Sequence, residues 1–383
     1  MIYLDNNAST PLDPEVWRVM EQAATVHGNA SSVHAEGQKA RRVVEESRES
    51  VARLLGARPE EVFLTAGGTE SNAMAVFGAA AGRPGRVVIS AAEHPSVREA
   101  VARLASGGTE VVAVPPERSG ALDPGRVLEA VTPGTALVSV MAANNEYGGV
   151  FPIAEIAGEV RRRGALFHSD AVQLAGRLPV DVVDWGVDFL SVSAHKMHGP
   201  KGAGALYVRR GVGLVPHTPG GGQERRQRAG TENTLAIAGF GAAARLARER
   251  LSSDAHEIAR LRDRLECGIL ERLAGTRVIG AHAPRIPNTS AVLFEGAPGE
   301  ALLVRLDLEG VAVSTGSACS SGTLAPSPAL LATGLSREEA RYVVRFSLSR
   351  MNREEEIDRV LDLLPEAVTA VRAAAPAEAG RAR

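Results

Sequence analysis

Cysteine is scarce in this sequence, since the 383 residues contain only Cys267 and Cys319. Two cysteines cannot form the disulfide framework of a small secreted domain, and their number favours a reducing cytoplasmic compartment. No apolar run reaches the roughly 18 residues that a membrane-spanning helix requires, because the stretches 136–143 and 235–244 are too short. The N-terminus lacks the basic segment and apolar core of a signal peptide. We therefore expect a soluble cytoplasmic protein without a membrane partner.

An excess of one charge is also absent, since 43 basic residues face 45 acidic residues and the net charge is −2. That balance excludes a strongly basic nucleic-acid binder, and 44% hydrophobic residues exclude a disordered chain. Among the basic residues only Lys39, Lys196 and Lys201 are lysines. Such a lysine can be retained for chemistry as a neutral amine, which arginine cannot perform, although for any one of them a chance remnant is an equally good explanation.

Short apolar runs alternate with amphipathic stretches in the first two thirds of the chain. Seven runs are predicted to be strands, at residues 62–65, 86–90, 111–114, 136–142, 165–169, 189–193 and 205–208. Several are apolar on both faces, which is typical of a mainly parallel sheet between helices. Helical stretches at 70–81, 96–105 and 153–163 separate them, so the pattern predicts an α/β fold.

The C-terminal part has a different rhythm. A long helix is expected over 233–273, with a break near Ser252, and short strands are expected at 277–279, 290–294, 311–314 and 342–348. Helices are expected at 299–308 and 353–373. We predict a large domain from residues 15–250 and a smaller α+β domain from residues 1–14 and 251–383.

Three local sequence patterns come directly after predicted strands, at the sheet edge where α/β folds place their functional sites. The run 65–72, with Gly67 and Gly68, can hold an anion at a helix N-terminus, but a plain turn explains it equally well. Asp170 follows one strand and alone is better explained as a helix cap, whereas Lys196 follows the next strand after Ser193 and His195. Together, an amine, an acid and an anion cradle are what pyridoxal 5′-phosphate requires.

Further residues can contribute to such a site. His94 follows a strand and could stack on a ring, although a lone histidine is more often structural. Cys319 lies among small residues, which favours delivery of a thiolate to a substrate over an incidental thiol. Cys267, within a helical run, is expected to be an inert structural cysteine. Arg345 interrupts an apolar strand and needs an anion, either a substrate carboxylate or a structural ion-pair partner.

Ten motifs in order, from residue 3 to about 350, together resemble a known family. They include Gly68-Thr69-Glu70-Ser71-Asn72, Asn144-Asn145-Glu146, Asp170-Ala171-Val172-Gln173, Ser193-Ala194-His195-Lys196, Arg228-Ala229-Gly230-Thr231-Glu232 and Ser317-Ala318-Cys319. The sequence resembles the cysteine desulfurases of the NifS/IscS type, which are class V aminotransferase-like, fold type I pyridoxal-phosphate enzymes.

The resemblance assigns expected roles to individual residues. Lys196 matches the Schiff-base lysine, Asp170 the partner of the pyridine nitrogen, and Gln173 the donor to the ring hydroxyl. His94 matches the ring-stacking histidine and a candidate proton shuttle, and Cys319 the nucleophile that attacks the substrate sulfur. The phosphate contacts match Gly68, Thr69, Ser193, His195 and, from the second subunit of a homodimer, Thr231. Groups near the ring and the substrate carboxylate match Asn145 and Arg345.

The implied reaction converts L-cysteine to L-alanine and leaves a persulfide on Cys319. The implied partner is a sulfur-acceptor protein such as an iron–sulfur scaffold, for iron–sulfur cluster assembly or tRNA thiolation. No resident metal and no direct nucleic-acid contact are expected, although Cys319 could transiently contact a nascent iron–sulfur cluster. The alternatives are a selenocysteine lyase, or an aminotransferase of small amino acids, which would have no use for Cys319.

Overall fold

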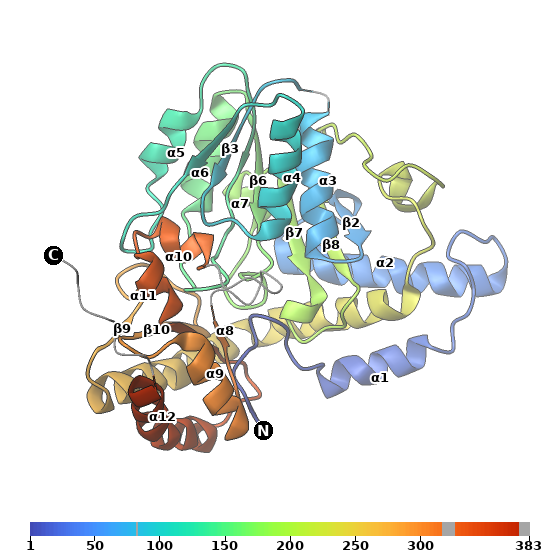
Figure 1. Ribbon diagram of the computed structural model, residues 1–383. Coiled ribbons are helices and arrows are strands. Elements are labelled where there is room, and N and C mark those ends of the chain that lie inside the picture. The colour runs from blue at the N-terminus through green and yellow to red at the C-terminus, as the bar shows by residue number, and fades with distance from the viewer. Residues whose placement is uncertain (82, 316–325, 375–383) are drawn as a thin grey trace.

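The computed structural model describes residues 1–81, 83–315 and 326–374. Within these residues, a seven-stranded sheet has the strand order β2-β8-β7-β6-β5-β3-β4 (Figure 1). Its strands are β2 (Val62–Thr65), β3 (Arg86–Ser90), β4 (Val111–Val114), β5 (Thr135–Ser139), β6 (Leu166–Asp170), β7 (Phe189–Ser193) and β8 (Gly204–Val208). The pairs from β7 through β4 are parallel, whereas β8 is antiparallel to β7 and to β2. The predicted α/β class with a mainly parallel seven-stranded sheet is confirmed.

Helices cover both faces of this sheet because successive strand residues point to opposite sides. Val87 and Ile89 of β3 pack in the core beneath α3 and α4, whereas Val88 between them packs in the core on the other face. The helices that connect the strands are α3 (Gly68–Ala80), α4 (Pro95–Ser106), α5 (Pro124–Ala130), α6 (Ile153–Arg162) and α7 (Val182–Trp185). The strand predicted over 136–142 is shorter than expected and ends at Ser139.

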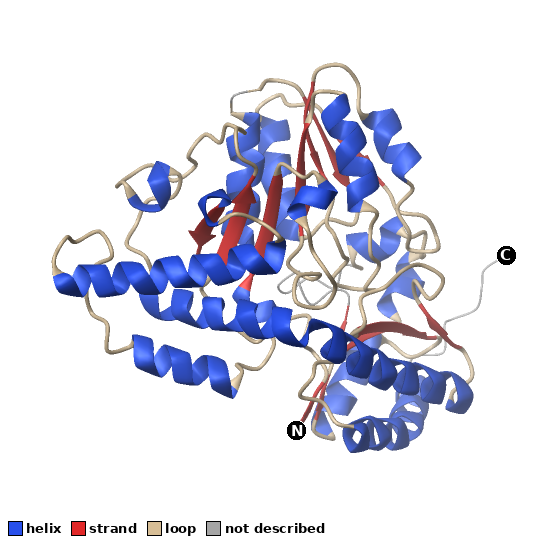
Figure 2. Cartoon of the chain, turned by 180° about the vertical axis from the view of Figure 1, so that it is seen from behind, coloured by secondary structure: helices blue, strands red, loops and turns tan. Residues whose placement is uncertain are grey.

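A long helix extends from the large sheet to the C-terminal part of the chain (Figure 2). The expected break near Ser252 is wrong, because α8 (Thr234–Arg272) is one continuous helix of 39 residues. Ser253 is compatible with the helix because its hydroxyl donates a hydrogen bond to the backbone carbonyl of Arg250, one turn earlier. The remaining elements of this part of the chain are the helices α1 (Pro14–Ala23) and α2 (Ala35–Leu55) and the 3₁₀ turns η1 (Pro59–Glu61), η2 (Ala194–Lys196) and η3 (Gln223–Arg226).

The C-terminal part contains a four-stranded antiparallel sheet in the order β12-β13-β10-β9. The strands of this sheet are β9 (Thr276–Val278), β10 (Thr289–Phe294), β12 (Ser314–Thr315) and β13 (Val343–Ser347). The helices of the C-terminal part are α9 (Gly299–Leu308), α10 (Pro328–Ala332), α11 (Arg337–Arg341) and α12 (Glu354–Ala374). The strand predicted over 311–314 is divided, because β11 (Val311–Ala312) pairs with β1 (Ile2–Tyr3) in a separate parallel pair. The two-domain limits stay a prediction. No helix in the described part of the chain combines the length and hydrophobicity needed to cross a membrane.

Candidate active site

A cavity of about 320 Å³ opens at the carboxyl ends of β6 and β7. These strands are parallel and pair Asp170 with Ser191, so the loops that follow them leave the sheet side by side. Most residues that the sequence singled out line this cavity: Gly68, Thr69, His94, Asn145, Asp170, Gln173, Ser193, His195, Lys196 and Arg345. The fold therefore brings together side chains that are spread from position 68 to position 345.

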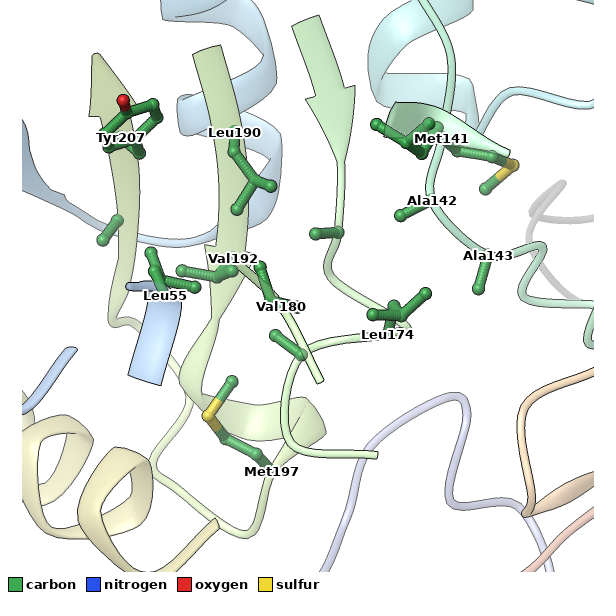
Figure 3. Close-up of a cluster of buried hydrophobic side chains, with 14 of the residues drawn as sticks. Leu55, Met141, Ala142, Ala143, Leu174, Val180, Leu190, Val192, Met197 and Tyr207 are labelled. Carbon is green, nitrogen blue, oxygen red and sulfur yellow. The ribbon is translucent and has the colours of Figure 1, made fainter. Parts of the chain in front are cut away.

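An apolar cluster supports the strand ends that carry the site (Figure 3). Val192 on β7 and Met197, which directly follows Lys196, both belong to this buried cluster. Leu174, four residues after Asp170, belongs to it as well. Because buried side chains pack at crystal-like density, these contacts restrict the backbone on either side of the amine and the acid.

Lys196 lies in the η2 turn that ends β7. Its Nζ donates to the backbone carbonyl of Asn7 and, at 3.0 Å, to that of Ala8. Both residues also line the cavity. The N-terminal segment thus forms the wall beside the amine, a contact between residues nearly 190 positions apart.

Asp170 is the last residue of β6 and is only 4% exposed. One carboxylate oxygen accepts the backbone N–H of Val172 at 2.9 Å, and the other accepts from Asn72 Nδ2 at 2.7 Å. Neither donor is a cation, so the two hydrogen bonds orient the carboxylate without neutralising its charge. Asn72 belongs to α3, and the sequence alone did not identify it as a hydrogen-bond partner of Asp170.

His94 caps the N-terminus of α4. Its Nδ1 accepts the backbone N–H of Ser96 at 3.1 Å and lies 2.8 Å from Ser96 Oγ. Burial lowers the pKa of His94, Asp170 opposes that shift, and Lys196 and Arg98 reinforce it. The ring is therefore neutral near pH 7.

The N-terminus of α3 lies at the cavity, where Gly68 and Thr69 line it. Gly67 has a φ of +151°, and a Cβ on Gly204 would lie 2.6 Å from its Cα, so both positions require the absence of a side chain. Ser193 Oγ is buried without a hydrogen-bond partner among the described residues, and Ser193 and Gly68 both line the cavity. Burial, reinforced by Lys196, lowers the pKa of neighbouring His195 to about 4, so this histidine offers a neutral ring.

Arg345 on β13 has a structural ion-pair partner, one of the two kinds of anion that the sequence left open. Its Nη2 forms an ion pair with Asp5 at 2.6 Å, and its Nη1 donates to the carbonyl of Asn145 at 2.9 Å. The side chain is 3% exposed and still lines the cavity. Its Nε is buried and has no hydrogen-bond partner among the described residues.

Two buried acids near the site were missed as functional candidates. Glu93 accepts the backbone N–H of Met141 at 2.6 Å, and burial raises its pKa well above the usual value. Burial raises the pKa of Glu146 to about 7, against the opposing effects of a hydrogen bond from Ser327 and the charge of Arg345. Glu146 was visible in the sequence only as part of a motif, because burial is a tertiary property.

Comparisons with known proteins identify the family. The model of the aminotransferase class-V family matches residues 2–360. A cysteine desulfurase from Sinorhizobium fredii (strain NBRC 101917 / NGR234) is 46% identical over 99% of both chains. The chain belongs to the cysteine desulfurases.

Other members of the family support the same assignment. The cysteine desulfurase IscS of Anaeromyxobacter dehalogenans (strain 2CP-C) is 45% identical, over 98% of this chain and 94% of its own. A solved NifS-like protein superposes with a TM-score of 0.91 at 35% identity, over 96% of this chain and 99% of that one. The protein SspA, solved in complex with cysteine, gives a TM-score of 0.82 at 35% identity, over 91% and 99% of the two chains.

Three residues that the sequence analysis singled out remain, namely Thr231, Cys319 and Cys267. Thr231 lines a separate cavity of about 180 Å³, together with Glu224 and Arg228, and not the cavity that contains Lys196. Cys319 lies outside the described residues. Cys267 was expected to be packed among apolar neighbours, but it is exposed on α8, because it lies on the solvent side of that amphipathic helix.

Proposed function

We propose that this chain converts L-cysteine to L-alanine with pyridoxal 5′-phosphate and carries the released sulfur as a persulfide on Cys319. The observation that carries the proposal is the placement of the Lys196 amine and the Asp170 carboxylate in one cavity, at the ends of neighbouring parallel strands. The relative SspA, solved in complex with cysteine, supports the choice of substrate.

The residues present fit the proposed cofactor. Ser193 Oγ, buried and without a partner among the described residues, and the N-terminus of α3 would hold its phosphate together with Thr69 and His195. Asp170 would bind the pyridine nitrogen, His94 would stack on the ring, and Gln173 and Asn145 would contact its edge. When bound, the cofactor supplies an electron sink for carbanion chemistry.

The side chains of the cavity have distinct tasks in this proposal. Lys196 removes the α-proton of cysteine through Nζ, which the carbonyls of Asn7 and Ala8 hold in place. Arg345 binds the substrate carboxylate, and Asp5 fixes the direction of its guanidinium. Asp170, which Asn72 orients, would stabilise a positive charge on the pyridine nitrogen of the bound cofactor.

Sulfur transfer requires Cys319 as the acceptor. The C–S bond of cysteine breaks, its sulfur forms an S–S bond with Sγ of Cys319, and the carbon that lost sulfur takes up a proton to become the methyl group of alanine. The described residues on either side of 316–325 lie near the cavity. Ser314 pairs with Arg345 across β12 and β13, and the side chain of Ser327 hydrogen-bonds Glu146.

A homodimer is part of the proposal. Thr231 lines a different cavity from the one that contains Lys196 in its own chain, and the Arg228 guanidinium holds the segment by an ion pair with Glu70 at 2.8 Å. We propose that Thr231 completes the phosphate site of a second copy of the chain. A sulfur-acceptor protein, such as an iron–sulfur scaffold, would then take the persulfide.

Mass spectrometry after a pulse of L-cysteine tests the function directly. The wild-type protein should gain one sulfur on Cys319 and release alanine, whereas Lys196→Ala should do neither and should lose the absorbance band of the lysine-bound cofactor. Cys267→Ala is the matched control and should behave as the wild type. Sulfur found on Cys267 alone, or turnover by Lys196→Ala, would overturn the proposal.

A further inference from the structure

Arg177 is a buried arginine that no carboxylate neutralises in the described part of the chain. It is 7% exposed, comparable to Arg48 and Arg345 at 3% each. Arg48 forms an ion pair with Glu224 at 2.6 Å, and Arg345 forms one with Asp5 at 2.6 Å. The charge that acts on Arg177 is that of Arg345, which has the same sign. Arg177 therefore differs from the other two in lacking a counter-charge.

Burial of an uncompensated cation is unfavourable for folding. Burial and, secondarily, Arg345 lower the pKa of Arg177 to about 9, so the group is still a cation near pH 7. Its Nη2 is buried without a hydrogen-bond partner among the described residues. A residue whose burial destabilises the fold in this way is expected to have a functional role.

The contacts of Arg177 are concentrated on one residue. Its Nη1 donates to the backbone carbonyl of Gln173 at 2.6 Å and to Oε1 of the same side chain at 2.5 Å. Gly176, at φ +80°, makes the tight turn that precedes Arg177, and a Cβ there would lie 3.1 Å from Cβ of Met197. The Arg177 guanidinium is therefore held against both the backbone and the side-chain oxygen of Gln173.

These contacts determine which end of the amide faces the cavity. Oε1 of Gln173 is occupied by Arg177, and Nε2 donates to the carbonyl of Asn7 at 3.0 Å. An amide nitrogen carries two hydrogens, so one is left after the bond to Asn7. Gln173 lines the cavity and Arg177 does not, so the arginine acts on the site through Gln173.

We propose that Arg177 is a positioning residue, which holds the Gln173 amide with its nitrogen toward the cavity as a hydrogen-bond donor to the ring oxygen of pyridoxal 5′-phosphate. The inference rests on the proposed function, because it needs that cofactor in the cavity. It adds a residue to the site that touches neither cofactor nor substrate.

Titration of the apoprotein with pyridoxal 5′-phosphate, and with the analogue that lacks the ring hydroxyl, tests this role. Arg177→Met should bind pyridoxal 5′-phosphate about tenfold more weakly than the wild type, the effect of one hydrogen bond to a charged group. The two proteins should bind the deoxy analogue equally, because the oxygen that receives the bond is missing. Arg177→Lys keeps one donor and should restore the affinity to within about twofold.

Urea unfolding of the same apoproteins separates positioning from a structural role. Arg177→Met should be at least as stable as the wild type, because a buried cation without a counter-charge is removed. Arg48→Met is the matched control and should lower the unfolding midpoint, since it leaves the buried Glu224 carboxylate without its partner.

Three results would overturn the inference: equal weakening with both cofactor forms, unchanged affinity for both, or a loss of apoprotein stability like that of Arg48→Met. Failure of the wild type to bind pyridoxal 5′-phosphate would instead refute the proposed function.

Discussion

Replacing His168 with glutamine should remove the part of the acid sensitivity of this fold that His168 contributes. His168 is fully buried in β6, and its two ring nitrogens lie 2.8 Å from Ser139 Oγ on β5 and 3.0 Å from Ser191 Oγ on β7. Burial lowers its pKa from 6.5 to about 4, against the opposing charge of Asp170. Below pH 6.5 the unfolded chain therefore takes up a proton that the folded chain does not bind.

The magnitude follows from linkage between proton binding and unfolding. The contribution of neutral His168 is fully present above pH 6.5 and is lost as the pH falls toward 4. A difference of 2.5 pKa units corresponds to about 3 kcal/mol when the titration is complete, and about 2 kcal/mol is already lost at pH 5. Glutamine has no proton to gain, so His168→Gln escapes this loss.

Urea unfolding of the apoprotein between pH 7.5 and about pH 5, at one protein concentration, measures the effect. The difference in unfolding free energy between wild type and His168→Gln should shift by about 2 kcal/mol in favour of the variant. His256→Gln, at an exposed position of α8, should keep the pH dependence of the wild type. A difference between wild type and His168→Gln that does not change with pH would refute the reasoning.

Two other substitutions probe the cavity. Gly204→Ala should weaken binding of pyridoxal 5′-phosphate, since its Cβ would lie 2.6 Å from Gly67 Cα and displace the turn before α3, whereas Gly213→Ala, with no atom within 4 Å, should bind normally. Asp170→Ala should retain the cofactor but exchange the α-proton of cysteine slowly, because the pyridine nitrogen loses its charge partner. α-Deuterium exchange measures this, and a near-normal rate would exclude the electronic role.

Much of the large sheet could be predicted from local patterns. The runs at 62–65, 86–90, 111–114 and 189–193 were predicted with the same bounds as β2, β3, β4 and β7. Strands that are buried on both faces are recognisable because their apolar residues are consecutive. The long α8 was recognised, but its interruption was wrongly expected, since two adjacent serines on an exposed surface do not end a helix that packing elsewhere stabilises.

The sequence by itself determined which residue types end neighbouring strands, and hence that Lys196 and Asp170 would meet. Only the tertiary structure decided what surrounds them. Asn7 supports Lys196 and Asn72 orients Asp170, although they lie 189 and 98 positions away in the chain. The packing of distant elements also decided that Arg177 is buried without a carboxylate partner among the described residues. Periodicity reports the local face on which a side chain lies, whereas these contacts depend on how distant elements pack, and no local pattern contains that information.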